Sequence, residues 1–169
     1  MLTGGVMTAV PNERGRTARA AQKWSALGNE RRSHDAAVEF RDRLLANNWP
    51  DDTTVAERMD AQLRIDARHA LTGMRLGGML LGVWSAPREC FIYPDFQFDN
   101  DGRLIPEISM LLRILPAEDD DSGWRRAFWL YSPHALLDGS TPSEMFALDP
   151  LRILEVADAE FNTSPDSGW

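Results

Sequence analysis

Prolines bound the apolar runs in the second half of the sequence, so this half can form only short helices. After Pro106, the apolar residues at positions 108, 111, 112 and 115 have the i, i+3, i+4, i+7 spacing of one helix face, and Pro116 follows them. Proline fits the first turn of a helix but cannot continue one, because it has no N–H to donate. The pattern predicts a helix over residues 106–115.

Three further short helices are predicted downstream. Residues 124–131 form a short run dense in aromatic side chains. The Thr141–Glu144 segment combines capping-box spacing with proline at the first helical position. A second Asp-Pro pair begins an apolar pattern that predicts a helix over about residues 150–161.

Helical periodicity in the first half predicts two longer helices, over residues 30–46 and 54–72. The second begins with capping-box spacing between Thr54 and Glu57. Gly73 suits the position just after its end, because glycine adopts a positive φ without a Cβ penalty.

The period then changes from helical to strand-like. Residues 79–85 and 89–93 are two β-prone runs around a turn and predict a β-hairpin, preceded by a short segment at 74–78. Helix, turn, short helix and hairpin in this order resemble a winged helix-turn-helix, in which Arg75 and Arg88 would contact DNA phosphates. Two glycines weaken the would-be recognition helix, so the alternative is that the hairpin only packs.

The predicted fold class is mainly α, a small helical bundle with one β-hairpin in a degenerate winged helix-turn-helix-like segment. The predicted divisions are a flexible basic arm at 1–29, a helical region with the winged segment at 30–94, a helical domain at 95–161 and a tail at 162–169. The arm could contact nucleic acid or be a solvated tail.

Charge differs between the two halves. Residues 1–90 contain 13 basic and 11 acidic side chains, a net charge of +2, whereas residues 91–169 contain 5 and 15, a net charge of −10. An acidic half repels nucleic acid and attracts a basic protein. The alternative is that the acidic side chains only keep a small domain soluble.

Residues that carry catalysis are not grouped in the sequence. His34, His69 and His134 lack metal-ligand spacing, and Cys90 lies beside apolar strand residues with no second thiol. Nucleophile elbows, Walker loops and dinucleotide fingerprints are absent. The sequence therefore predicts a protein that is not an enzyme and uses no metal or cofactor.

The segment Asp99–Gly102 is similar to part of an EF-hand calcium loop, but the first and twelfth ligand positions of that loop would be occupied by Gln97 and Ile108. A tight turn explains these residues better.

A single cysteine excludes an intramolecular disulfide, and no run approaches the roughly 20 apolar residues that span a bilayer. These features predict a cytoplasmic protein without membrane association.

Two spaced motifs distinguish the second half from a generic helical domain. The first is Phe96-Gln97-Phe98-Asp99 leading into the helix after Pro106. The second is Trp129-Leu130-x-x-Pro133 followed by Leu137-x-Gly139-x-Thr141-Pro142-x-Glu144. Over about residues 79–161 the sequence resembles the toxin-binding domain of Xre/MbcA/ParS-type bacterial antitoxins.

The resemblance implies a dimerising or toxin-binding helical bundle. Its usual partner is a RES-domain toxin that consumes NAD, and the antitoxin often represses its own operon. The toxin-contacting residues implied are Trp124, Trp129, Leu137, Gly139, Thr141, Pro142, Glu144, Met145, Asp166 and Trp169. The sequence departs from the family in lacking a well-formed helix-turn-helix, so a DNA-binding regulator without a toxin partner is the alternative reading.

The tail carries Asp166 and Trp169. In the context of this resemblance, a carboxylate beside an indole could mimic the phosphates and ring of NAD and so occupy a toxin's nucleotide pocket. The alternative is a frayed tail without a role.

Overall fold

The computed structural model describes residue 30, residues 32–59 and residues 67–162. The chain divides into two compact units, residues 1–44 and residues 45–169. In the first unit the described residues from 32 onward are helical, in agreement with the helix predicted over 30–46. The predicted arm at 1–29 and the tail residues Asp166 and Trp169 lie outside the described residues. All that follows concerns the second unit.

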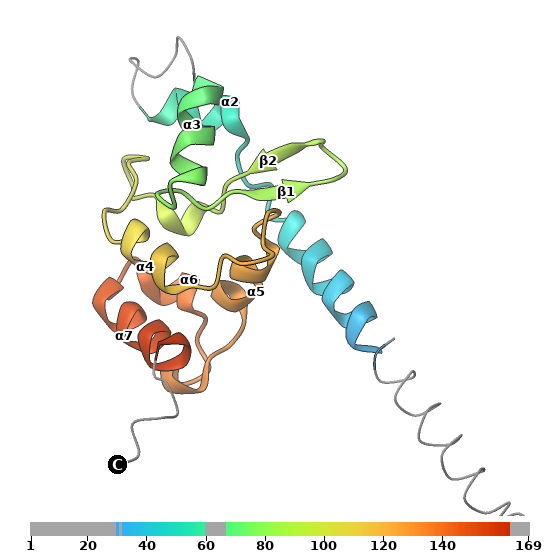
Figure 1. Cartoon of the computed structure of the whole chain (residues 1–169), viewed down its shortest axis with the longest axis vertical. Coiled ribbons are helices and arrows are strands. Elements are labelled where there is room, and N and C mark those ends of the chain that lie inside the picture. Colours follow the sequence, from blue (N-terminus) through green and yellow to red (C-terminus); the bar gives the residue numbers. More distant parts are fainter. Residues whose placement is uncertain (1–29, 31, 60–66, 163–169) are drawn as a thin grey trace, which may run out of the picture. The chain divides into compact units, whose positions relative to one another are not determined.

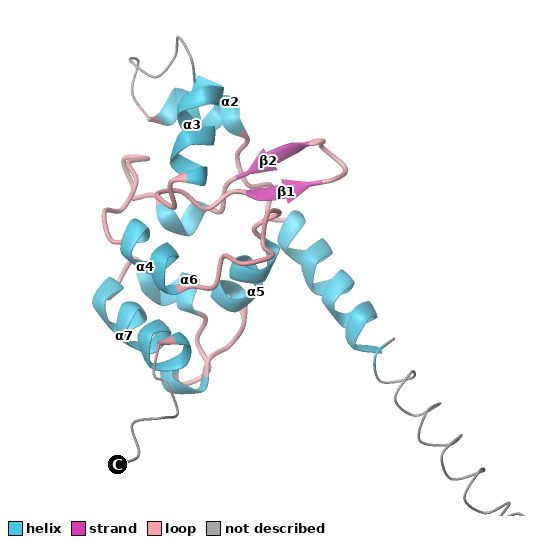
Figure 2. Cartoon of the chain, in the orientation of Figure 1, coloured by secondary structure: helices cyan, strands magenta, loops and turns pink. Residues whose placement is uncertain are grey.

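The second unit is mainly helical, and the part of it that the structure describes contains one two-stranded antiparallel sheet, which confirms the predicted fold class (Figures 1 and 2). None of the described helices is long and apolar enough to cross a bilayer. In chain order the elements are α2 (Asp52–Arg58), α3 (Ala67–Leu76), β1 (Val83–Ser85), β2 (Cys90–Ile92), the 3-10 helix η2 (Asp95–Gln97), α4 (Ile108–Ile114), α5 (Trp124–Tyr131), the 3-10 helix η3 (Ala135–Leu137), α6 (Pro142–Phe146) and α7 (Pro150–Phe161).

Two hydrophobic clusters organise this unit. A small one joins α2, α3 and the end of the hairpin through Val55, Ala56, Leu71, Leu80 and Tyr93. A larger one is built on α4, α5, α6 and α7, with α7 packed against both α4 and α6 (Figure 1). Its buried members are Leu81, Ile108, Leu111, Leu112, Leu115, Leu130, Leu137, Phe146, Ile153, Leu154, Val156 and Ala157.

The start of α2 differs from the prediction. Asp51 is the N-cap, and its Oδ1 accepts hydrogen bonds from the backbone N–H of Thr54 at 3.0 Å and from its hydroxyl at 2.9 Å. The capping box predicted between Thr54 and Glu57 is therefore wrong, because Thr54 already lies inside the helix. The continuous helix predicted over 54–72 is also wrong, since α2 ends at Arg58 and Met59 has a non-helical ψ of 52°.

The end of α3 also differs from the prediction. Gly73 lies within the helix, and Gly78, with φ of +67°, is the residue that ends it. The N–H of Met79 donates to the carbonyl of Met74 and that of Gly78 to Arg75, which is the paired pattern of a Schellman motif. Residues 74–76 therefore belong to α3 and do not form a separate short helix.

The hairpin lies where the sequence places it, with shorter strands than predicted. Val83 pairs with Ile92, Trp84 with Phe91 and Ser85 with Cys90. Beyond it, Asp99 forms the predicted tight turn, because its Oδ1 accepts hydrogen bonds from the backbone N–H groups of Asp101 and Arg103.

A buried amide joins the segments before and after the hairpin. The side chain of Gln97 is fully buried, its Oε1 accepts from the N–H of Leu81 at 2.9 Å, and its Nε2 donates to the carbonyls of Leu81 at 2.8 Å and Pro94 at 3.0 Å. Each of these backbone groups would otherwise be buried without a partner. These hydrogen bonds give a structural role to Gln97, which belongs to the Phe96–Asp99 sequence motif.

The C-terminal helices follow the sequence closely. α5 and α7 have the predicted bounds, and the capping box at the start of α6 is complete: the N–H of Glu144 donates to the Thr141 hydroxyl, and the Glu144 carboxylate accepts from the Thr141 N–H. Pro142 and Pro150 occupy the first helical turns of α6 and α7.

Candidate partner-binding site

α7 has a buried face and an outer face. Ile153, Leu154, Val156 and Ala157 point into the large cluster. Leu151, Glu155 and Asp158, spaced i, i+4 and i+7, lie on the opposite side and are exposed. We call these three residues, with the preceding Leu148, the outer face of α7.

Three leucines near the start of α7 are largely exposed. Leu148 is 78% exposed, Leu151 is 64% exposed, and Leu136, in η3, is 57% exposed. The guanidinium of Arg152 donates to the carbonyl of Leu136 at 3.1 Å, so η3 lies beside the start of α7. Single exposed apolar side chains are common on protein surfaces, whereas grouped ones mark interaction sites.

The start of α7 is held firmly. Asp149 is its N-cap and accepts a hydrogen bond from the N–H of Arg152 at 3.1 Å, and Pro150 fixes φ in the first turn. The N–H of Asp149 in turn donates to the carbonyl of Met145 in α6 at 2.9 Å. The leucines on either side of Asp149 are therefore displayed from an ordered backbone.

The segment that carries the outer face is acidic, and two of its carboxylates, Glu155 and Asp158, lie on that face. Between residues 148 and 160 the side chains comprise four carboxylates, Asp149, Glu155, Asp158 and Glu160, and one guanidinium, Arg152, a net charge of −3. Within the described part of the chain, the Glu155 side chain has no hydrogen bond or ion pair. A partner that bound here would meet apolar surface at one end of the helix and negative charge along it.

The other end of α7 is tied to α5 and η3. Oε2 of Glu160 accepts hydrogen bonds from Nε1 of Trp129 at 2.8 Å and from Nε2 of His134 at 2.9 Å. Nδ1 of His134 accepts from the N–H of Leu136 at 3.2 Å, which assigns the neutral tautomer with its proton on Nε2. Burial raises the pKa of Glu160, but the hydrogen bonds from Trp129 and His134 together lower it by more, so its pKa lies below the ordinary value.

A small cavity of about 210 Å³ lies next to this group, with apolar walls from Leu115, Pro116, Trp129 and Phe161 and polar edges from Arg125, Arg126 and Glu160. A wider, open one of about 630 Å³ lies between the end of α3 and the loop over residues 115–121, and its lining mixes arginines with carboxylates. Neither holds a group of potential metal ligands, and none was found elsewhere in the described residues.

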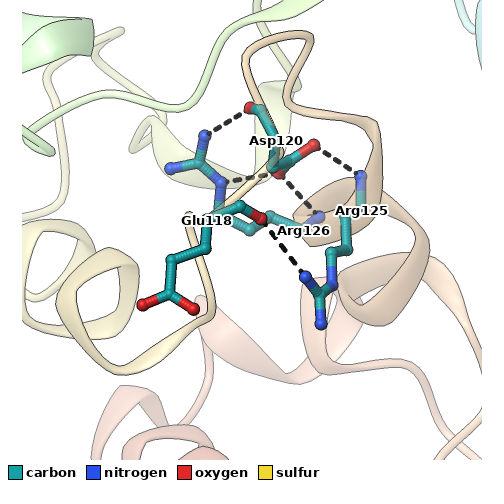
Figure 3. Close-up of polar contacts among 4 residues, drawn as sticks. All are labelled: Glu118, Asp120, Arg125 and Arg126. Atoms are coloured by element: carbon teal, nitrogen blue, oxygen red, sulfur yellow. Dashed lines mark hydrogen bonds and ion pairs between the residues drawn. The ribbon is translucent and has the colours of Figure 1, made fainter.

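The acidic loop before α5 serves as a helix cap (Figure 3). Asp120 is only 3% exposed, and its carboxylate accepts from the N–H groups of Arg125 and Arg126 and from Nε of Arg126 at 2.9 Å. The Arg125 guanidinium donates to the carbonyl of Glu118 at 3.2 Å. These bonds satisfy two of the free N–H groups in the first turn of α5, so the buried Asp120 carboxylate has a structural role.

Most of the toxin-contacting residues implied by the sequence pack within the unit. Leu137 and Pro142 are buried, and Thr141, Met145, Trp124 and Trp129 are partly buried. Trp124 donates to the carbonyl of Trp84 at 2.9 Å, and its ring lies 5.8 Å from that of Phe128. Of the described residues in the predicted set, only Gly139 and Glu144 are exposed, and Glu144 caps α6.

Both arginines predicted to contact DNA have intramolecular contacts. The Arg75 guanidinium stacks on the ring of Phe91 at 3.5 Å from its centroid. Arg88 donates to the carbonyl of Trp49 at 2.9 Å and to Oδ2 of Asp51 at 3.0 Å. The hairpin is thus fastened to the start of α2 through one of the two predicted DNA contacts.

The exposed leucines were missed at the level of sequence, although a signal was present. Leu151 lies off the buried face that Ile153, Val156 and Ala157 define, and Leu148 precedes the helix. A helical projection of residues 150–161 would have placed Leu151 with Glu155 and Asp158.

Comparisons of the chain with family models, with curated proteins and with solved structures returned no match.

Proposed function

We propose that this protein is a non-catalytic antitoxin that binds and neutralises a co-encoded RES-domain toxin, which consumes NAD. One observation carries the proposal. The two motifs that resemble the antitoxin domain supply residues that hold one helical unit together. Gln97 bonds to the backbone of Leu81, Trp129 joins α5 to α7, and Thr141 caps α6.

The surface of this unit supports binding rather than chemistry. His134, the one histidine among these helices, has both ring nitrogens engaged by Glu160 and by the N–H of Leu136. The C-terminal half carries a net charge of −10, which suits a basic partner such as a protein with a nucleotide-phosphate pocket. A cytoplasmic location belongs to this proposal, and a single cysteine is compatible with a reducing compartment.

Autorepression of the operon is a secondary part of the proposal, and a DNA-binding regulator without a toxin is the alternative function. The order α2, α3 and hairpin supports either. The internal contacts of Arg75 and Arg88 favour the antitoxin, because a guanidinium already bonded to its own protein is less available to a phosphate.

The test uses the full chain and the purified product of the neighbouring gene. We expect a complex that survives gel filtration and in which NAD consumption by the toxin is suppressed. Co-expression of the full chain should also restore growth to cells that express the toxin. Free migration of the two proteins with undiminished NAD consumption would overturn the proposal.

A further inference from the structure

We infer that the outer face of α7, with Leu136 beside it, is the surface that docks the partner, and that this partner presents an apolar pocket flanked by basic side chains. The inference rests on the proposed function and deepens it by naming the surface and its complement. It replaces the aromatic side chains that the sequence suggested as anchors, because those side chains pack within the unit.

The first step is that the exposed leucines are not needed for folding. α7 is anchored by its opposite face, where Ile153 and Ala157 are fully buried and Leu154 and Val156 nearly so. Leu148 and Leu151 keep most of their surface in water, so they gain little from folding and would gain from a partner. Their substitution should therefore leave the unit folded.

The second step is that these side chains are already positioned. Asp149 caps α7 between the two leucines, Pro150 fixes the first turn, and Arg152 holds Leu136 alongside. A surface displayed from a rigid backbone loses little conformational entropy when it binds. This arrangement is what an apolar anchor at the centre of an interface requires.

The third step is charge, which selects the occupant. Glu155 and Asp158 continue the outer face, and the 148–160 segment has a net charge of −3. A second copy of this chain bound through the same face would bring like charges together, which costs free energy. A partner whose apolar pocket is flanked by lysine or arginine side chains would match this face. Its pocket would receive the leucines, and its basic side chains would lie opposite Glu155 and Asp158.

The apolar half of the inference is tested with the double variant Leu148→Ser/Leu151→Ser in the full chain. Leu76→Ser is a matched control, because Leu76 is also 78% exposed but lies at the end of α3. Binding to the purified neighbouring-gene toxin is measured by calorimetry. We expect the double variant to bind about 100-fold more weakly, as for the loss of two interface anchors, and the control to bind as the wild type does.

The charged half is tested with Glu155→Lys, and Glu118→Lys is the control because it makes the same change in net charge off the face. We expect Glu155→Lys to weaken binding about 10-fold, chiefly through slower association, and to reduce the dependence of the association rate on salt. The control should change neither measurement.

The outcomes separate the two proposals. If the wild type does not bind the toxin, the proposed function fails and this inference fails with it. If the wild type binds and the double variant binds equally well, only the inference fails. If light scattering shows that the wild type self-associates and the double variant does not, the face is a contact between copies and the inference is overturned.

Discussion

Nε1 of Trp129 donates a hydrogen bond of 2.8 Å to Oε2 of Glu160 and so joins α5 to the last turn of α7. The same oxygen accepts from Nε2 of His134, and the ring of Trp129 lies 5.7 Å from that of Phe161. A tryptophan that the sequence assigned to a toxin interface therefore fastens the helical unit together.

The first prediction concerns the pH dependence of this link. The pKa of Glu160 is lowered below its ordinary value of 4.5, because the hydrogen bonds from Trp129 and His134 outweigh burial. A lowered pKa means that the ionised form stabilises the fold above the unfolded-state pKa, and that this contribution is lost as pH falls through the folded-state pKa. Since the Glu160 side chain is 42% exposed, we expect Glu160→Gln to cost only about 0.5 kcal/mol at pH 7.

Urea unfolding of the wild type and Glu160→Gln at pH 7 and at pH 3 measures the effect. The difference in the free energy of unfolding should shrink at pH 3, and Glu155→Gln, on the same helix, should show no such change. A difference that is the same at both pH values would contradict the assignment.

Much of the fold could be predicted from the sequence, because local signals set it. Proline at the first turn and capping side chains placed α6 and α7 correctly, a run dense in aromatic side chains marked α5, and the change of period placed the hairpin. The start of α2 and the end of α3 were predicted wrongly, because two local signals competed at each of these positions. Asp51 is a cap as good as Thr54, and of three nearby glycines only the tertiary structure selects Gly78 to take a positive φ.

The second prediction concerns Gly123, the N-cap of α5. Its φ is +75°, and an added Cβ would overlap the carbonyl oxygen of Gly82. Gly123→Ala therefore combines backbone strain with a clash against backbone that cannot move aside. We expect a loss of about 3 kcal/mol or more in the free energy of unfolding.

Gly139 supplies the control for this prediction. Its φ is +86°, but an added Cβ would have no atom within 4 Å. Gly139→Ala should thus cost only the conformational term, about 1 kcal/mol. Thermal unfolding of both variants separates the two contributions, and equal losses would show that the approach of Gly82 to Gly123 is not tight.

The third prediction concerns the amide of Gln97. Gln97→Leu keeps the approximate size of the side chain but leaves the N–H and carbonyl of Leu81 and the carbonyl of Pro94 without this partner. We expect a loss of about 3 kcal/mol, because buried polar groups that lose their partners retain the cost of desolvation. Chemical unfolding measures it, and a loss below about 1 kcal/mol would show that water replaces the amide.

The candidate site was harder to predict than the fold. Aromatic residues are frequent both at interfaces and in cores, and the sequence alone does not tell the two apart. Trp129 and Trp124 pack within the unit because α7 and the hairpin supply hydrogen-bond acceptors for their indoles. Whether Leu151 is buried or exposed depends on which face of α7 meets α4 and α6, and that is decided by tertiary packing.

The last prediction separates a structural role of Arg88 from a DNA contact. Arg88 donates to Asp51, whose pKa is lowered below its ordinary value of 3.8, first by the backbone hydrogen bond from Thr54 and, against the effect of burial, by the Thr54 hydroxyl and Arg88. The ionised carboxylate stabilises the fold above that value, and the contribution is lost as pH falls through the lowered pKa. Arg88→Ala should therefore cost about 1 kcal/mol at pH 7, and the cost should shrink as the pH falls through the lowered pKa of Asp51, because the carboxylate then loses its charge. In a gel shift with the gene's own promoter, any affinity and its salt dependence should be unchanged. A reduced salt slope with unaltered unfolding would instead identify Arg88 as a phosphate contact and restore the DNA-binding alternative.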